Sequence, residues 1–272
     1  MNDINDNADS VSFDYRVLVV EDEEVNRFVA RGIMASIGIA PDLAESGAEA
    51  LAKVASNHYD LIFMDVQMPE MDGLETTALI RQRLHDDGRS HIPIIALTAF
   101  ALKGDREHFL EAGMDDYMTK PLMRDNLIDM LKCWLDGRGD PQLNQDRQHI
   151  QARPYGPLDA ARFAELKQSM RSVPDGLRKV LESYQESLVR LPATMAEAID
   201  NKDSEALYRA AHSLKSNSAA AGALKLSALS ADLENQADKE ITEEIETIFL
   251  QIETEIDRVK VALKAKLKDI SR

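Results

Sequence analysis

The chain has 272 residues, enough for two domains of ordinary size that each bury a core of their own. Its formal net charge of -16 disfavours binding to the nucleic-acid backbone, so no nucleic-acid partner is expected. Cys133 is the single cysteine, which excludes an internal disulfide and a cysteine-rich zinc site and fits a cytoplasmic chain. The longest nearly apolar run, residues 92–102, falls short of the roughly 20 residues that span a bilayer, so no direct membrane insertion is expected.

The first half of the chain alternates short apolar runs with amphipathic stretches, the pattern that βαβ units require. After a disordered segment at 1–14, it predicts an α/β domain over residues 15–136 with a doubly wound, five-stranded parallel sheet. The expected strands are 17–20, 41–44, 61–64, 94–97 and 116–118, and the clearest helices are 25–37, 73–84, 104–112 and 124–135.

A polar segment punctuated by glycine and proline, residues 137–157, follows and is predicted to be a linker. Beyond it, apolar residues recur at helical spacing and no strand pattern returns. Residues 158–272 are therefore predicted to form an all-α helical bundle. The expected helices are 159–170, 175–201, 204–221, 224–237 and 242–268.

Asp65 follows the apolar run 61–64, and in parallel sheets ligands gather at the carboxyl ends of the strands. The first strand ends in Glu21 and Asp22, which would lie beside Asp65 if the first and third strands are neighbours. Three converging carboxylates repel one another unless a hard cation neutralises them, and Mg²⁺ suits oxygen ligands that await a phosphoryl group. The acidic pair alone has a simpler explanation, because Asp22 or Glu23 would also cap the helix that follows.

Two more polar residues are expected at the same edge of the sheet. Thr98 ends the fourth strand and Lys120 follows the fifth, which would add a hydroxyl and an ammonium to the carboxylates. Pro121 disfavours helical backbone at Lys120, and their peptide bond is a candidate for the cis form. A phosphatase with an aspartate nucleophile would need a second acid two residues further on, but position 67 is glutamine, so stored phosphoryl fits better than turnover.

With Glu21-Asp22, Asp65, Thr98 and Lys120-Pro121 in place, residues 15–136 resemble a response-regulator receiver domain, which has a flavodoxin-like fold. The resemblance implies that Asp65 accepts a phosphoryl group from the phosphohistidine of a sensor histidine kinase. It also implies that Lys120 pairs with the phosphoryl oxygens and that Thr98 donates a hydrogen bond to one of them. The implied Mg²⁺ ligands are Glu21, Asp22, Asp65 and Gln67.

His212 lies on the predicted helix 204–221, about 200° around the helix from the apolar residue Leu214. We therefore expect the imidazole to point outward, away from the core of the bundle. Ser216 and Ala219 are small, so another domain would be able to approach the imidazole closely. Lys215 would offset the negative charge of a phosphoryl group.

This stretch resembles the signature of histidine phosphotransfer (HPt) domains, and the resemblance covers about residues 158–268. It implies that His212 carries a phosphoryl group with Lys215 beside it. The sequence departs from the family at Ser216, where glycine is usual. Neither a P-loop nor a glycine-rich ATP-binding pattern is found, so we expect a phosphotransfer intermediate without ATP-dependent kinase activity of its own.

The sequence thus predicts a two-component phosphorelay protein. Asp65 would take phosphoryl from a kinase, and His212 would relay it to a downstream response-regulator receiver, or the reverse. The alternative is a phosphorylation-gated interaction protein in which His212 is inert and the helical domain only binds partners. The chain would be either a free-standing intermediate or the C-terminal end of a hybrid sensor histidine kinase.

Overall fold

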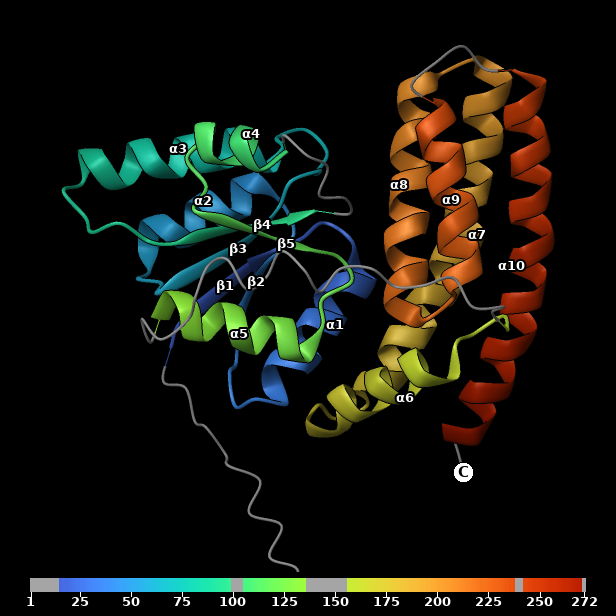
Figure 1. Ribbon diagram of the computed structural model, residues 1–272, viewed down its shortest axis with the longest axis horizontal. Coiled ribbons are helices and arrows are strands. Elements are labelled where there is room, and N and C mark those ends of the chain that lie inside the picture. The colour runs from blue at the N-terminus through green and yellow to red at the C-terminus, as the bar shows by residue number, and fades with distance from the viewer. Residues whose placement is uncertain (1–14, 99–104, 136–155, 238–241, 271–272) are drawn as a thin grey trace, which may run out of the picture.

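The protein is described here by a computed structural model covering residues 15–98, 105–135, 156–237 and 242–270. It has an α/β domain, residues 15–135, and a helical domain, residues 156–270, which lie side by side (Figure 1). The segment 1–14 and nearly all of the predicted linker lie outside the described residues. The domain boundaries drawn from the sequence therefore stay predictions.

A sheet of five parallel strands, in the order β2-β1-β3-β4-β5, forms the centre of the α/β domain. The strands are β1 (Val17–Val20), β2 (Asp42–Ala44), β3 (Leu61–Asp65), β4 (Ile94–Thr98) and β5 (Asp116–Thr119). This confirms the predicted doubly wound sheet, and every strand begins and ends within one residue of its expected bounds. Because β1 and β3 are neighbours, the acids that follow β1 meet the aspartate that ends β3.

Helices cover both faces of the sheet, which explains why β1 is apolar throughout and β3 is apolar up to Asp65 (Figure 1). On one face lie α1 (Glu24–Ala35) and α5 (Arg124–Leu135). On the other lie α2 (Gly47–Ser56), α3 (Gly73–Asp86) and α4 (Asp105–Glu111). Helix α1 ends two residues before its expected end, because Gly38 adopts a left-handed φ of 85° and Ile39 N–H donates back to Met34 O at 3.0 Å.

The helical domain is the predicted bundle. Four long helices pack together: α7 (Gly176–Asn201), α8 (Ser204–Ala221), α9 (Leu224–Ala237) and α10 (Glu243–Ile270). They are preceded by α6 (Ala160–Ser169) and the 3₁₀ turn η1 (Met170–Ser172), which run across to α1 of the α/β domain (Figure 1). Among the described helices, even those long enough to cross a bilayer lack the apolar composition that a membrane span requires.

The two domains are joined by a continuous apolar cluster. It runs from Val29 and Ile33 on α1 through Leu166 and Met170 into the core of the bundle. Side-chain hydrogen bonds flank this apolar contact. They join Asn26 Nδ2 to Ser216 Oγ at 2.8 Å, Asn217 Nδ2 to Glu23 Oε2 at 2.9 Å, Ser183 Oγ to Glu24 Oε2 at 2.8 Å and Gln67 Nε2 to Tyr208 Oη at 2.7 Å. The carboxyl edge of the sheet therefore faces helix α8.

Candidate functional site

Three carboxylates converge at the carboxyl edge of the sheet. Glu21, Asp22 and Asp65 each place one oxygen within 4.8 Å of the other two. The Lys120 ammonium lies 2.6 Å from Asp65 Oδ2 and 2.7 Å from Glu21 Oε2, so it bridges two of the three acids. The Lys120–Pro121 peptide bond is cis, the form that the sequence suggested. Asp65 is only 2% exposed, whereas Asp22 is half-buried and also lines an open cleft.

The other two residues predicted for this edge make main-chain hydrogen bonds there. Thr98 ends β4, and its carbonyl oxygen accepts a hydrogen bond from Lys120 N–H at 2.7 Å. The backbone N–H of Gln67 donates to Asp65 Oδ1 at 3.3 Å. The Gln67 side chain extends to the helical domain, where it donates to Tyr208 Oη. Gln67 therefore lies beside the acidic cluster with its backbone, while its side chain contacts the other domain.

Burial and mutual repulsion make the acids bind protons more tightly. Burial raises the pKa of Glu21 to about 7, and the charge of Asp65 adds to the rise. Burial also raises the pKa of Asp22 to about 6, together with the charge of Glu21. The pKa of Asp65 is raised by burial against the opposing charge of Lys120. Burial lowers the pKa of Lys120, but the charges of Asp65 and Glu21 outweigh it, so the net pKa lies above its ordinary value.

His212 lies on the polar face of α8, as expected, but it is not exposed. Its side chain is buried, with an exposed fraction of 9% for the residue. Helix α9 supplies Glu234, whose Oε1 lies 2.7 Å from His212 Nδ1, and the ring of Tyr208 stacks on the imidazole with 6.5 Å between ring centroids. The α/β domain lies across the cleft from the remaining side. The helical pattern identified the polar face of α8 correctly, but α9 and the α/β domain cover that face.

Glu234 is the residue that sequence reasoning missed. It contacts both His212 and Lys215, and the Lys215 side chain is buried in an ion pair with it. Burial lowers the pKa of His212, although the hydrogen bond to Glu234 opposes this. Burial likewise lowers the pKa of Lys215 against the charge of Glu234. In the sequence, Glu234 is an acidic residue next to apolar residues of the predicted helix 224–237. This position alone does not show that it contacts His212 and Lys215.

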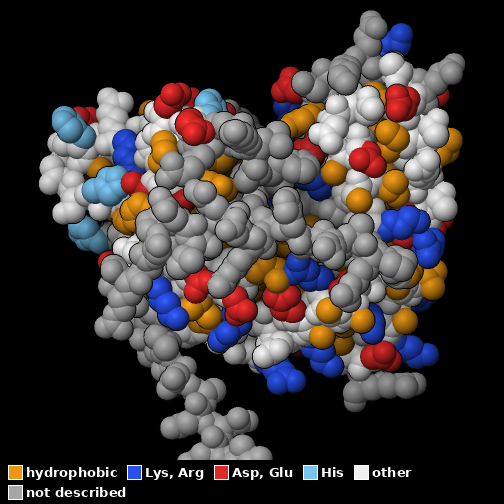
Figure 2. All heavy atoms as spheres, viewed as in Figure 1, with side chains coloured by type: hydrophobic (Ala, Val, Ile, Leu, Met, Phe, Trp, Pro, Cys, Tyr) orange, Lys and Arg blue, Asp and Glu red, His pale blue; other side chains and the backbone are white. Residues whose placement is uncertain are grey.

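Asp22 of the acidic cluster and His212 line one cleft between the domains, with a volume of about 770 Å³. Asp22 and Gln67 line one wall, and Tyr208 and His212 line the other. On the face drawn in Figure 2, the histidines that reach the surface lie over the α/β domain, whereas His212 is enclosed between the domains.

Comparison with known protein families identifies both halves of the chain. Residues 17–132 match the response regulator receiver domain, and residues 179–262 match the Hpt domain. The polar-differentiation response regulator DivK of Brucella abortus is 40% identical over 119 residues, which are 44% of this chain and 94% of DivK. The hybrid signal transduction histidine kinase I of Dictyostelium discoideum is 38% identical over 145 residues, 50% of this chain but 8% of that protein. The chain thus spans a small part of that kinase.

Solved structures also resemble this chain. The receiver domain of the Pseudomonas aeruginosa sensor histidine kinase PA1611, with magnesium coordinated in its active-site cleft, is 38% identical and has a TM-score of 0.40, covering 45% of this chain and 98% of that one. A chain of the Saccharomyces cerevisiae complex between Ypd1 and the Ssk1 receiver domain is 31% identical with a TM-score of 0.43, covering 44% and 88%. By its sequence matches and its two folds, this chain belongs to the response-regulator receiver family, carries an Hpt domain after the receiver, and is a two-component phosphorelay protein.

Proposed function

We propose that this chain relays a phosphoryl group between Asp65 and His212 within one molecule. Asp65 receives it from the phosphohistidine of a sensor histidine kinase, and His212 passes it to the receiver of a downstream response regulator, or the flow is reversed. The observation that carries the proposal is the cleft that has Asp22 and Gln67 on one wall and His212 on the other. This arrangement supports transfer between the two domains while they stay docked.

The transfer exchanges one bond to phosphorus for another. His212 Nε2 attacks the phosphorus of the Asp65 acyl phosphate, the bond from phosphorus to the carboxylate oxygen breaks, and Asp65 leaves as a carboxylate. Nδ1 is occupied by Glu234, so Nε2 is the free nucleophile. Burial favours the neutral imidazole, which has the lone pair that the attack requires. Glu234 then stabilises the positive charge that develops on the ring.

The remaining site residues orient the phosphoryl group and neutralise its charge. Lys120 already contacts Asp65, so its ammonium is placed to pair with phosphoryl oxygens bound there, and Thr98 would donate its hydroxyl to one of them. Lys215 would offset negative charge on the side of His212. These roles are mainly positioning and charge neutralisation, which is what phosphoryl transfer asks of a protein.

Receiver domains bind Mg²⁺ at their acidic site, and the donors of this chain fit that ion. Glu21, Asp22 and Asp65 offer hard oxygen ligands close together, with a half-buried member on the open cleft. We assign the Mg²⁺ site to these three residues and to the main-chain carbonyl of Gln67. When bound, Mg²⁺ supplies positive charge that neutralises the phosphoryl oxygens.

Mg²⁺ affinity is expected to fall as the pH is lowered through the pKa values of the acids. The cation binds the deprotonated carboxylates, and burial raises the pKa of Glu21 to about 7 and that of Asp22 to about 6. Proton competition at these values weakens apparent binding roughly twentyfold between pH 8 and pH 6. Titration of the intact chain with MgCl₂, followed by NMR shifts of the receiver amides, measures this. Equal affinities at the two pH values would contradict the assigned ligands, and Asp22→Asn serves as the control with weakened binding.

Labelling of the intact chain with acetyl phosphate tests the proposed relay. Label is expected at both Asp65 and His212, and the two are distinguished because acyl phosphate is lost in alkali whereas phosphohistidine survives alkali and is lost in acid. His212→Gln should keep only the alkali-labile label. If the wild-type chain never acquires label that is stable in alkali and labile in acid, the helical domain is a binding module and the relay is wrong.

A further inference from the structure

Helix α6 and turn η1, residues 160–172, form an arm that precedes the matched Hpt region 179–262. The arm contacts α1 of the α/β domain (Figure 1). Leu166 and Met170 of the arm are buried in the apolar cluster that joins the two domains. The arm therefore adds a docking contact that is separate from the helix carrying His212.

Gly32 forms a notch in α1 at the end of this contact. It lies in the helix interior, where glycine is destabilising relative to alanine, and its backbone is not in the left-handed region that favours glycine. A Cβ placed on Gly32 would lie 2.5 Å from Sδ of Met170 and closer still to its terminal methyl group. The missing side chain thus makes room for Met170, and this contact accounts for a glycine that the helix itself disfavours.

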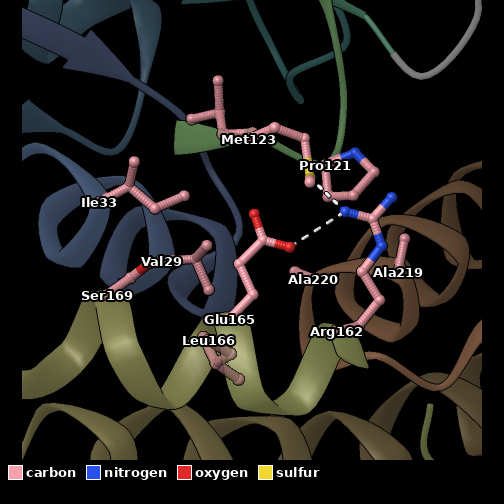
Figure 3. Close-up of a pocket in the computed structure, with 11 residues that line it drawn as sticks. Val29, Ile33, Pro121, Met123, Arg162, Glu165, Leu166, Ser169, Ala219 and Ala220 are labelled. Atoms are coloured by element: carbon pink, nitrogen blue, oxygen red, sulfur yellow. Dashed lines mark hydrogen bonds and ion pairs between the residues drawn. The ribbon is translucent and has the colours of Figure 1, made fainter. Parts of the chain in front are cut away.

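The rest of the contact surrounds a small pocket (Figure 3). Val29 and Ile33 of α1 face Leu166 of the arm across a small void with a volume of about 30 Å³. Arg162 extends over this void, with its guanidinium 3.3 Å from Glu165 Oε2 and in contact with Met123 Sδ of the α/β domain. Neither Gly32 nor Met170 lines the cleft that holds Asp22 and His212.

We propose that the fit of Met170 into the Gly32 notch selects the chain's own α/β domain as the partner of His212. The inference rests on the proposed intramolecular relay. The contacts near the cleft, Asn26 with Ser216 and Gln67 with Tyr208, lie where any receiver must approach the histidine. The arm adds a contact that a receiver with a larger side chain at the position of Gly32 would not make, so Gly32 and Met170 are specificity-determining residues.

The test moves the large side chain of the contact from Met170 of the helical domain to position 32 of the α/β domain, in the full-length chain. Gly32→Leu fills the notch, and Met170→Ala removes the side chain that occupies it. The double variant restores nearly the original side-chain volume at the contact. Arg31→Leu is the matched control, because Arg31 is exposed on the same helix in the docked chain. Docking is followed by small-angle X-ray scattering, which does not depend on phosphotransfer, and transfer by rapid-quench assay of acid-labile label.

Gly32→Leu is expected to increase the maximum dimension in scattering and to slow transfer from Asp65 to His212 by about tenfold or more, as overpacking of a close contact does. Labelling of Asp65 by acetyl phosphate should not change, and the double variant should recover both compactness and rate. Wild-type compactness and rate in Gly32→Leu would overturn the proposal, as would failure of Met170→Ala to rescue it. If no variant transfers phosphoryl, the relay itself fails, while the scattering still decides whether Gly32 and Met170 control docking.

Discussion

Asp65→Asn is expected to abolish incorporation of phosphoryl from acetyl phosphate over the whole chain, at His212 as well as at the sheet. The amide lacks the nucleophilic oxygen, and the side chain that Lys120 contacts loses its charge. Under the proposed relay His212 loses its label too, because Asp65 is the source of its phosphoryl group and His212 is buried against Glu234. Radioactive label on the variant and on the wild type, counted after acid and alkali treatment, measures the effect.

The control for this experiment is His212→Gln, which should keep the Asp65 label at the wild-type level. Mg²⁺ should be present throughout, since the acids need a cation before they accept a phosphoryl group. Unchanged label on Asp65→Asn would place the acceptor elsewhere. Label on that variant that is stable in alkali and labile in acid would show that His212 reacts with the donor directly and does not depend on the α/β domain.

Glu234→Ala is expected to slow transfer to His212 by about 10²-fold, the effect of misplacing a reacting group, while Asp65 is labelled normally. Glu234 holds Nδ1 of His212 and pairs with Lys215, so its removal frees the ring and leaves a buried ammonium without its carboxylate. Asp232→Ala, at an exposed position of the same helix, is the matched control. Rates are measured by rapid quench from chains labelled at Asp65.

The pH profile separates positioning by Glu234 from a purely structural effect. Burial lowers the pKa of His212 and the hydrogen bond to Glu234 raises it, so Glu234→Gln should lower the pKa further. The neutral imidazole would then persist to more acidic pH, and the acidic limb of the transfer rate would move to lower pH. An unshifted limb with a wild-type rate would exclude a role for Glu234 in the reaction.

The strand ends were predictable because their chemistry is local in the sequence. Asp65 directly follows an apolar strand, and Glu21 and Lys120 follow two others, so the parallel sheet alone brings the three together. The cis form at Lys120–Pro121 was likewise suggested by a single dipeptide. For such residues, knowing which strands are neighbours is enough to place the side chains at one edge.

The surroundings of His212 depend on contacts between distant elements. Helical spacing on α8 gave the correct polar face, but the partner Glu234 lies on α9, 22 residues further along. The small residue Ser216 indicated that a domain approaches there, without showing that Asn26 of the same chain does so. Gly32 is a helix-disfavouring residue inside a predicted helix, a pattern that indicates close packing by another part of the protein. Only the fold shows that the side chain packed there is Met170.

Transfer between Asp65 and His212 inside one molecule is the central claim, and its dependence on protein concentration tests it most directly. Docked or tethered domains have an effective concentration on the order of millimolar, well above that of a micromolar solution. The intact chain is compared with a mixture of the His212→Gln variant, which is labelled at Asp65, and the Asp65→Asn variant, which supplies His212. The intact chain should transfer at a rate that dilution does not change, while transfer in the mixture should be far slower and proportional to concentration. Exchange in the micromolar mixture as fast as in the intact chain would contradict the intramolecular relay.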